Sequence, residues 1–330
     1  MIKSKALVSQ ALRTLKENIQ RTGDPLGFTR NYWSEWAHGL ELPKGGDTVL
    51  YTARMYQMLP FVLQTTQMVP TVKPFLTVPG VSPLLRAGNR LAGECMIRMM
   101  ARNEDEIRFQ GKKALGGIAK ALNSVGIRPG FLYDDEPYSG ALLHDLGLEG
   151  QILPHVRQVC RTFLDHGVKT IITVDPHTTH MLKLIFPTIV PEFHPEVRHY
   201  TELLQERGKS ENWTPSDLLP LEFVLHDSCV MTRDLDLVAP IRNLSNQMGF
   251  KLNTPENNGK NTACCGGPVE YAFGDLCHQI STIRIRELSQ VGRNIITACP
   301  ICLINLKKYE TELGVRIWDM GEVLNQSLPQ

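Results

Sequence analysis

Apolar and polar positions follow two different periods along this chain, and the two periods alternate. Short runs of apolar and β-branched residues predict strands. They cover residues 48–52, 130–133, 170–174, 221–227, 293–298 and 314–318. Between them the apolar residues recur at helical spacing, as in residues 55–125, which prolines interrupt, and in residues 149–166 and 235–248. Strands that alternate with helices predict an α/β fold of mainly parallel sheets flanked by helices.

The start of the chain is predicted to be a helical segment ahead of the first strand. Leu12, Leu15 and Ile19 recur at the spacing of an amphipathic helix over residues 5–21. A Gly-Asp-Pro-Leu-Gly stretch then ends this helix, because glycine and proline both break helical structure. We therefore treat residues 1–46 as a helical N-terminal segment.

The composition excludes several classes of protein. Lysine and arginine number 35 against 34 aspartates and glutamates, and the two signs are interspersed, so no surface for nucleic acid is predicted. No apolar run reaches the roughly 20 residues of a membrane-spanning helix, and residues 1–20 lack the apolar core of a secretory signal. We expect a cytoplasmic protein with no membrane span. In that compartment thiols stay reduced, and clustered cysteines indicate metal or redox chemistry.

Five of the eight cysteines follow a C…CCG…CxxC pattern in less than a quarter of the chain. They are Cys229, Cys264, Cys265, Cys299 and Cys302. Adjacent cysteines and a CxxC turn can surround a multi-iron centre, whose ligands are thiolates. A structural zinc and a set of reduced core cysteines are the alternatives, although zinc normally takes four ligands. Gly266, after the adjacent pair, would permit a tight turn and offer an amide hydrogen bond to a cluster sulfur.

A repeat with a constant offset relates the two halves of the chain. Residues 171–178 can be laid over residues 295–302 at an offset of 124, which predicts a duplicated unit. We expect two pseudo-repeated Rossmann-like halves, at residues 47–200 and 201–330. In the first half, the positions that correspond to the cysteines hold Ala53, Asp134, Asp135, Asp175 and Thr178. The first half is therefore degenerate, and one iron–sulfur site is expected, in the second half.

The emptied pocket of the first half keeps several polar residues. They are Asp134, Asp135, Asp175, His177 and His180. If the repeat holds, these side chains converge and could bind a metal or a polar substrate. The alternative, which we favour, is a decayed site whose polar groups are solvated.

The remaining candidates are one histidine and three cysteines. His226 precedes the first cysteine of the pattern by three positions and is the candidate catalytic residue, since it would orient the loop or lie near a substrate. The alternative is a plain hydrogen-bonded histidine at a strand end. Cys277 lies on a predicted helix, where we favour packing over a role as sixth ligand. Cys95 and Cys160 are predicted to be core residues.

The cysteine pattern resembles that of the cysteine-rich CCG-domain family. This family includes the B and D subunits of heterodisulfide reductase, the sulfite-reductase-associated K subunit, and subunits of glycolate and lactate oxidases. The segments at residues 18–27 and 194–204 are similar to segments of the D and K subunits, and the His-Asp-Ser-Cys sequence that ends at Cys229 is similar to the family's His-Asp-Pro-Cys. The family spacing is also kept, with 34 residues between Cys229 and Cys264.

The resemblance implies one [4Fe–4S] cluster, cubane or noncubane, on the five cysteines of the pattern. It implies an oxidoreductase subunit of a heterodisulfide-reductase-like complex that transfers electrons in thiol or disulfide chemistry, for example in cytoplasmic sulfur oxidation. Because the ferredoxin-like domain of the D and K subunits is missing, the expected partners are ferredoxin-type iron–sulfur subunits and flavin subunits. Two other functions remain open. One is a non-catalytic scaffold or sulfur-ligand-binding subunit with a structural cluster or zinc, and the other is an electron-transfer subunit of a hydroxy-acid oxidase.

Overall fold

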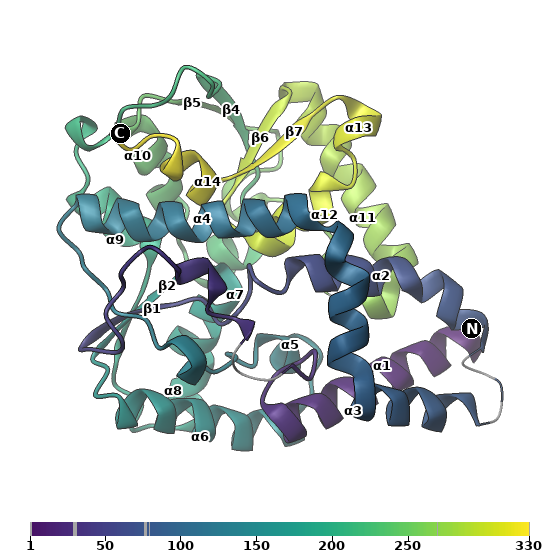
Figure 1. The fold of residues 1–330 in the computed structure, drawn as a ribbon. Coiled ribbons are helices and arrows are strands. Elements are labelled where there is room, and N and C mark those ends of the chain that lie inside the picture. The colour runs from purple at the N-terminus through teal and green to yellow at the C-terminus, as the bar shows by residue number, and fades with distance from the viewer. Residues whose placement is uncertain (1, 29–31, 76–77, 79, 269, 330) are drawn as a thin grey trace.

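The strands form two separate parallel sheets (Figure 1) in the computed structural model, which describes residues 2–28, 32–75, 78, 80–268 and 270–329. The first sheet has the order β1-β2-β3, and its strands are β1 (Thr48–Tyr51), β2 (Thr170–Thr173) and β3 (Glu196–His199). The second sheet has the order β5-β4-β6-β7, and its strands are β4 (Glu222–Leu225), β5 (Lys251–Asn253), β6 (Asn294–Thr297) and β7 (Arg316–Asp319). The predicted α/β fold with parallel sheets is confirmed.

The two sheets repeat one arrangement. In the first sheet β2 lies between β1 and β3, and in the second β6 lies between β4 and β7. Strand β6 begins 124 residues after β2, which is the offset of the sequence repeat. Each of these central strands is half-buried at its first residue and buries its Ile-Ile-Thr end. β-Branched residues suit such positions because they pack well on a pleated surface.

Helices flank both sheets and extend beyond them (Figure 1). Those of the first half and its lead-in are α1 (Ile2–Thr22), α2 (Leu59–Val72), α3 (Val81–Met100), α4 (Asp105–Ser124), α5 (Ala141–Asp145), α6 (Glu149–Asp165), α7 (Pro176–His180), α8 (Phe186–Ile189) and α9 (Tyr200–Arg207). Those of the second half are α10 (Ala239–Gln247), α11 (Glu270–Val291), α12 (Pro300–Lys307), α13 (Glu310–Leu313) and α14 (Met320–Asn325). Helices α1, α2 and α3 lie together on one side of the molecule, at the right of Figure 1.

Helix α4 joins the two halves. It runs between the two sheets and packs against α14 (Figure 1). The two backbones approach so closely that a Cβ added at Gly117 would lie 2.0 Å from the carbonyl oxygen of Gly321. A Cβ added at Gly321 would lie 2.5 Å from the carbonyl oxygen of Ala114. Glycine at both positions therefore permits this contact between the halves.

The strand predictions need three corrections. Residues 130–133 make isolated bridges to Lys44 and Val49 and then enter a 3₁₀ turn, η5 (Tyr133–Asp135), because the polar residues that follow favour a turn. Strands β3 and β5 were not predicted from the sequence. Both strands place polar residues at exposed or half-buried positions, so they lack the continuous apolar run that marks a buried parallel strand.

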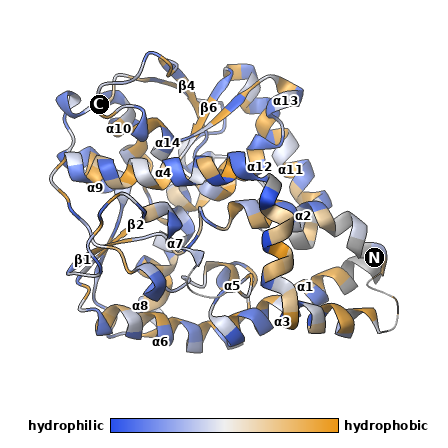
Figure 2. Ribbon diagram, in the orientation of Figure 1, coloured by the Kyte–Doolittle hydropathy of each residue, from blue (hydrophilic) through white to orange (hydrophobic). Residues whose placement is uncertain are grey.

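Helix α3 carries apolar side chains that face solvent. Leu84, Leu91 and Met99 are 72%, 88% and 58% exposed, and Figure 2 shows hydrophobic stretches along this helix. Cys95 lies on the same helix and is exposed, so the prediction that it is a core residue is wrong. Among the described residues, no helix combines the length and the apolar character that crossing a membrane would require.

Candidate metal centre

The five cysteines of the C…CCG…CxxC pattern converge in one place as free thiols. Cys229 Sγ lies 3.9 Å from Cys264 Sγ. Cys264 also contacts Cys265. Cys265 in turn contacts Cys302, which contacts Cys299. The last three are buried, whereas Cys229 and Cys264 are partly exposed, so solvent reaches the set from one side.

Two neighbouring strands place three of these cysteines. Strand β4 ends at Leu225, and Cys229 opens the π-helical turn η8 (Val230–Asp234). Strand β6 ends at Thr297, and Cys299 is the N-cap of α12. Because β4 and β6 pair in parallel, their carboxyl ends meet at one edge of the sheet. Cys302, in the first turn of α12, completes this group.

Asp227 brings the CCG loop to the same edge. Its buried carboxylate accepts two hydrogen bonds from Arg242, at 2.8 and 2.7 Å, and one from the Gly259 N–H at 2.7 Å. Its carbonyl oxygen accepts a hydrogen bond from Thr262 Oγ1 at 3.0 Å. The loop before Cys264 is therefore tied to the end of β4, which explains the position of Asp227 in the His-Asp-Ser-Cys motif.

Gly266 shapes the CCG loop itself. Its φ is +92°, and an added Cβ would lie 2.6 Å from the carbonyl oxygen of Cys277. The Gly266 N–H donates a hydrogen bond to Cys264 Sγ at 3.3 Å. On the other side of the loop, Asn305 Nδ2 donates to the carbonyl oxygen of Cys265 at 2.9 Å. The sequence-based role of Gly266, a tight turn with an amide directed at sulfur, matches this geometry.

Substitution of Gly266 by alanine is expected to weaken metal binding. The left-handed backbone costs a non-glycine residue about 1–2 kcal/mol, and the contact with Cys277 forces the loop to move. We expect the iron content of purified protein to fall at least several-fold. Gly274→Ala is the control, because an added Cβ there meets no atom within 4 Å. Equal iron content in the two variants would contradict this role of the loop.

His226 lies beside the cysteines and has one unpartnered ring nitrogen. The side chain is 1% exposed, and Nδ1 accepts a hydrogen bond from Arg284 Nε at 3.1 Å. One ring nitrogen and the Sγ atoms of Cys265 and Cys302 all lie within 4.8 Å of one another. Burial and the Arg284 charge lower the pKa of His226 to about 3, so the ring is neutral. Since Nδ1 is an acceptor, the proton lies on Nε2, which is buried without a hydrogen-bond partner.

Arg284, which was not predicted from the sequence, fixes the orientation of His226. It is fully buried on α11, and its charge is balanced by Glu287 Oε2 at 2.7 Å. It also donates hydrogen bonds to the Asn257 carbonyl oxygen at 2.9 Å and to Thr262 Oγ1 at 3.2 Å. The sequence contained a signal for this position. Arg284 lies four residues before the apolar Leu288, and residues four apart lie on the same face of a helix.

The residues at this site fit an iron–sulfur cluster. Hydrogen bonds from Cys229 and Cys265 lower the pKa of Cys264, whereas the pKa of Cys229 is raised because its proton is held in that same contact. The neighbouring thiols therefore do not all ionise without added positive charge, which bound metal ions supply. Five thiols exceed the four ligands of a single zinc. The buried Nε2–H of His226 would also gain an acceptor from a cluster sulfur.

The polar residues of the first half do not converge on a pocket. Asp135 pairs with Lys44 at 3.0 Å, and Asp134 Oδ1 accepts a hydrogen bond from Ser34. Asp175 is buried and accepts a hydrogen bond from the Thr178 N–H as the N-cap of α7. The shared pocket, which was the less favoured alternative, is not formed. The favoured alternative, a decayed site with solvated polar groups, fits Asp134 and Asp135 near the surface but not the buried Asp175, which caps a helix.

The two histidines of that group face the other half of the molecule. His177 and His180 lie on α7, which packs against η8 next to Cys229. His177 Nδ1 hydrogen-bonds with Asp145 Oδ2 at 3.1 Å. Burial lowers the pKa of His177, but the neighbouring Asp145 and Cys299 side chains outweigh burial and raise the pKa well above its usual value.

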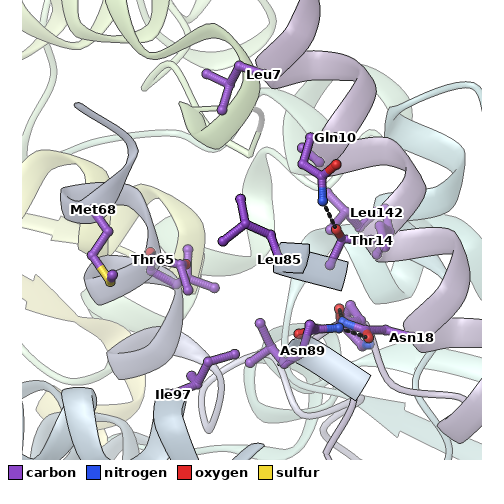
Figure 3. Close-up of a pocket in the computed structure, with 15 residues that line it drawn as sticks. Leu7, Gln10, Thr14, Asn18, Thr65, Met68, Leu85, Asn89, Ile97 and Leu142 are labelled. Carbon is purple, nitrogen blue, oxygen red and sulfur yellow. Dashed lines mark hydrogen bonds between the residues drawn. The ribbon is translucent and has the colours of Figure 1, made fainter. Parts of the chain in front are cut away.

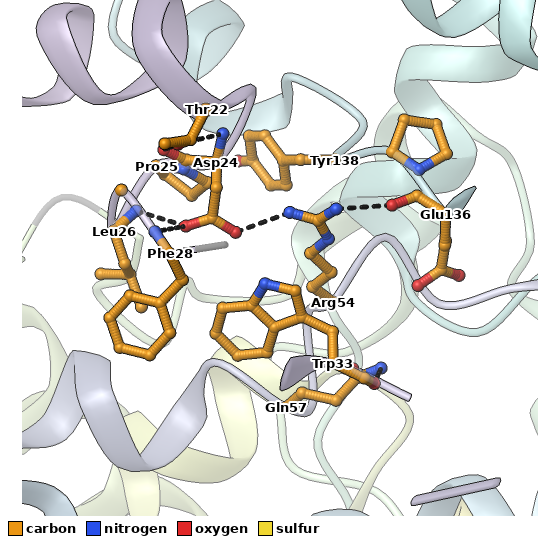
Figure 4. Close-up of polar contacts among 12 residues, drawn as sticks. Thr22, Asp24, Pro25, Leu26, Phe28, Trp33, Arg54, Gln57, Glu136 and Tyr138 are labelled. Carbon is orange, nitrogen blue, oxygen red and sulfur yellow. Dashed lines mark hydrogen bonds and ion pairs between the residues drawn. The ribbon is translucent and has the colours of Figure 1, made fainter. Parts of the chain in front are cut away.

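A buried ionic network lies just after the carboxyl end of β1, at a place where the first half has no cysteine (Figure 4). Arg54 is 3% exposed, and its Nη1 donates to Asp24 Oδ2 at 2.7 Å while its Nη2 donates to the Glu136 carbonyl oxygen at 2.6 Å. The Glu136 carboxylate accepts from the Thr52 N–H at 2.6 Å and from Thr52 Oγ1 at 2.8 Å. These residues tie the N-terminal segment to the first sheet.

Glu136 makes the stability of the protein depend on pH. Burial raises its pKa from 4.5 to about 7, so the folded state binds its proton more tightly than the unfolded state. The stabilisation is complete below about pH 4.5 and is lost as the pH rises through 7, a change of roughly 3 kcal/mol. We expect Glu136→Gln to lose less folding stability than the wild type between pH 5 and pH 7.5, measured as the urea midpoints of unfolding at these two pH values. The exposed control Glu256→Gln should keep the wild-type decline, and the same decline in Glu136→Gln would contradict the prediction.

The other two cysteines outside the pattern are buried. Cys160 lies on α6, where burial raises its pKa to about 12, as expected of a core thiol. Cys277 lies on α11 with its carbonyl oxygen against Gly266, and burial raises its pKa to about 11. Its position supports packing on the helix over a role as sixth ligand.

An apolar cavity of about 290 Å³ lies away from the cysteines, between α1, α2 and α3 (Figure 3). Leu7, Leu85 and Ile97 are among its lining residues. Its polar groups bond to one another, as Asn89 Nδ2 does to Asn18 Oδ1 at 2.8 Å. None of the five cysteines lines it, so it is separate from the candidate metal centre.

Residues 223–307 match the family model of the cysteine-rich domain CCG. This segment begins in β4, ends in α12 and contains all five cysteines of the pattern. The second half of the chain therefore contains a CCG cysteine-rich domain, and the resemblance drawn from the sequence is confirmed.

Three curated relatives are named as oxidoreductases or as a subunit of one. The chain is 29% identical over 227 residues to the probable iron-sulfur-binding oxidoreductase FadF of Bacillus subtilis, which is 66% of this chain and 32% of that protein. It is 28% identical over 227 residues to the EtfAB:quinone oxidoreductase of Syntrophomonas wolfei, with 64% and 32% covered. It is 27% identical over 203 residues to the D subunit of the dihydromethanophenazine:CoB–CoM heterodisulfide reductase of Methanosarcina acetivorans, with 57% and 48% covered. The chain thus spans about a third to a half of the length of these relatives.

Proposed function

We propose that this chain is an iron–sulfur subunit of a heterodisulfide-reductase-like complex, in which it transfers electrons during thiol or disulfide chemistry. The observation that carries the proposal is the convergence of five free thiols at one edge of the sheet, beside His226, whose Nε2 has no hydrogen-bond partner. A [4Fe–4S] cluster bound there would supply one-electron transfer, which divides a two-electron disulfide reaction into single steps.

The residues of the site divide into three roles. The five cysteines bind the cluster, and the Gly266 N–H donates to the thiolate of Cys264. His226 is the candidate catalytic residue, because Arg284 fixes its ring beside the cysteines and its unpartnered Nε2–H is free to donate to a sulfur there. Cys229 and Cys264 are partly exposed, so a thiol or disulfide would approach from their side.

Partner subunits are part of this proposal. A single cluster site can take one electron at a time, so a redox cycle needs a donor and an acceptor outside this chain. Ferredoxin-type iron–sulfur subunits and flavin subunits are the proposed partners. The name of the relative from Methanosarcina acetivorans, which is one subunit of a heterodisulfide reductase, supports a complex of this kind. A cytoplasmic setting in sulfur oxidation remains a prediction from the family resemblance.

A second candidate function follows from another of these relatives. The name of the relative from Syntrophomonas wolfei joins EtfAB to a quinone, and this relative is as similar to the chain as the heterodisulfide reductase relative is. The same cysteine site would then pass electrons between a partner protein and a quinone without disulfide chemistry.

Reoxidation of the reduced protein separates the two functions. Iron-loaded protein is reduced anaerobically with dithionite, freed of excess reductant, and mixed with either an organic disulfide or a water-soluble quinone, while its visible absorption is followed. We expect the disulfide to restore the absorption of the oxidised protein, and Cys302→Ala to abolish this response. Reoxidation by the quinone alone would favour the second function, and reoxidation by neither compound would contradict both.

A further inference from the structure

Helix α3 presents an apolar stripe to solvent along its length. Leu84, Leu91, Cys95 and Met99 follow one another at spacings of seven, four and four residues, which places them on one face of the helix. All four are exposed, and so is Gly88 between the first two. A surface helix normally turns its apolar face to the core. On α3 an apolar face points outward instead.

Positive charge is concentrated on α3 and on α1, which lies beside it at the right of Figure 1. Helix α1 and the segment from α3 through the turn η4 (Ala101–Asn103) together contain nine lysines and arginines and two glutamates. The rest of the chain then contains 26 basic and 32 acidic residues. These two helices are therefore strongly basic, although the whole chain has a net charge of only +1.

The seam between the two helices keeps an excess of positive charge. Glu17 of α1 pairs with Arg86 at 3.5 Å and with Arg90 at 3.1 Å, both on α3. Arg21 of α1 reaches the same place, where its Nη1 donates to the Arg90 carbonyl oxygen at 3.2 Å. One carboxylate thus faces three guanidinium groups. Arg13 lies one turn before Glu17, on the side of α1 that faces this seam, and is exposed.

A cavity of about 540 Å³ opens beside the apolar stripe. Four arginines are among its lining residues, namely Arg21, Arg90, Arg98 and Arg102. Leu91 and Met99 of the stripe line it as well, and Glu94 is its acidic lining residue. The planar fork of donors on a guanidinium group suits the oxygens of a phosphate. The cavity therefore combines groups that bind phosphate with apolar side chains next to them.

We propose that the face formed by α1 and α3 docks on a membrane of anionic phospholipids. The apolar stripe of α3 enters the interface between headgroups and acyl chains, and the arginine-lined cavity holds lipid phosphate groups. This arrangement is that of a helix that lies in the membrane surface, with apolar side chains on one face and basic residues beside them. The inference goes beyond the proposed iron–sulfur function and does not depend on it.

The physical basis is the sum of apolar burial and charge attraction. Leucine and methionine side chains that project from a helix leave water when they enter the lipid interface. Basic side chains near the surface are attracted by the negative potential of anionic lipids. Arginine stems can lie along the apolar side chains while their charged ends reach the phosphates. Both contributions act on the same face, so the protein should bind anionic membranes in one orientation.

The test is co-sedimentation of the full-length protein with large unilamellar vesicles. One set contains phosphatidylglycerol and phosphatidylcholine in equal parts, and the other contains phosphatidylcholine alone. We expect the apparent affinity to be at least about tenfold higher for the mixed vesicles, and to fall in about 0.5 M sodium chloride, which screens the charges. Leu84→Ser with Leu91→Ser, and separately Arg90→Gln with Arg102→Gln, should each weaken binding to the mixed vesicles about tenfold.

Leu218→Ser is the matched control. Leu218 is 84% exposed and lies before β4, outside α1 and α3, so its replacement should leave vesicle binding unchanged. The variants replace exposed side chains, so each should keep the wild-type unfolding transition. Wild-type protein that stays in the supernatant with mixed vesicles would overturn the inference and would leave this face to a partner subunit or a second copy of the chain. Equal binding by the wild type and the double leucine variant would overturn it too. None of these readouts depends on iron, so they are distinct from a failure of the proposed function.

Discussion

Replacement of Cys299 by alanine is expected to abolish iron binding. Cys299 is fully buried between the end of β6 and the start of α12, and its thiol contacts Cys302 and His177. Loss of groups outside the ligand set of a metal typically costs roughly 10- to 100-fold in affinity, so loss of a ligand from the centre of the set should cost at least about 100-fold. The measurement is iron and acid-labile sulfide per chain after anaerobic purification.

Cys160→Ala is the matched control for this variant. Cys160 is also a buried free cysteine, but it lies on α6 outside the pattern, so its alanine variant should keep its iron. The same pair of variants tests the scaffold alternative. If Cys299→Ala still assembles with its partner subunits but the complex no longer turns over, the cluster has more than a structural role. Wild-type iron content in Cys299→Ala would contradict the assignment of the five cysteines as ligands.

Replacement of Arg54 by methionine is expected to cost about 3–5 kcal/mol of folding stability, because it leaves the Asp24 carboxylate buried without its charge partner. Arg54 and Asp24 are 3% and 0% exposed and lie 2.7 Å apart. The guanidinium also holds the Glu136 carbonyl oxygen, so its loss releases the segment before α5 (Figure 4). Equilibrium unfolding in urea, followed by tryptophan fluorescence, measures the effect.

Lys44→Met provides the comparison for Arg54→Met. Lys44 pairs with Asp135 at 3.0 Å, but the two side chains are 63% and 38% exposed, and such exposed pairs contribute at most about 1 kcal/mol. The double variant Arg54→Met with Asp24→Leu should recover part of the lost stability, since it removes both buried charges. Equal small losses in Arg54→Met and Lys44→Met would contradict the structural role of this network.

Local patterns were sufficient to predict the main elements of the fold. The Ile-Ile-Thr runs of β2 and β6 are buried strands with β-branched residues, and their offset of 124 identified the repeat that both sheets show. The cysteine spacing likewise predicted which five thiols the structure brings together. In each case the information lies within a few residues of the feature, either as burial or as ligand chemistry.

Contacts between distant segments could not be predicted in the same way. Arg54 and Asp24 are 30 residues apart, and each charge alone resembles a solvated side chain in the sequence. His177 was considered only for a pocket of its own half, yet it lies near Cys299 of the other half, because the repeat predicts equivalent positions but not how the two halves pack. Strand β5 was missed because an edge strand of three residues needs no apolar run.

The central claim is that the five cysteines hold one iron–sulfur cluster, and metal and sulfide analysis with EPR tests it most directly. Anaerobically purified protein is assayed for iron, zinc and acid-labile sulfide, and EPR spectra are recorded in the oxidised and reduced states. We expect about four irons and four sulfides per chain, with an EPR signal that changes on reduction. One zinc per chain without sulfide would contradict the claim and would make the cysteines a structural metal site.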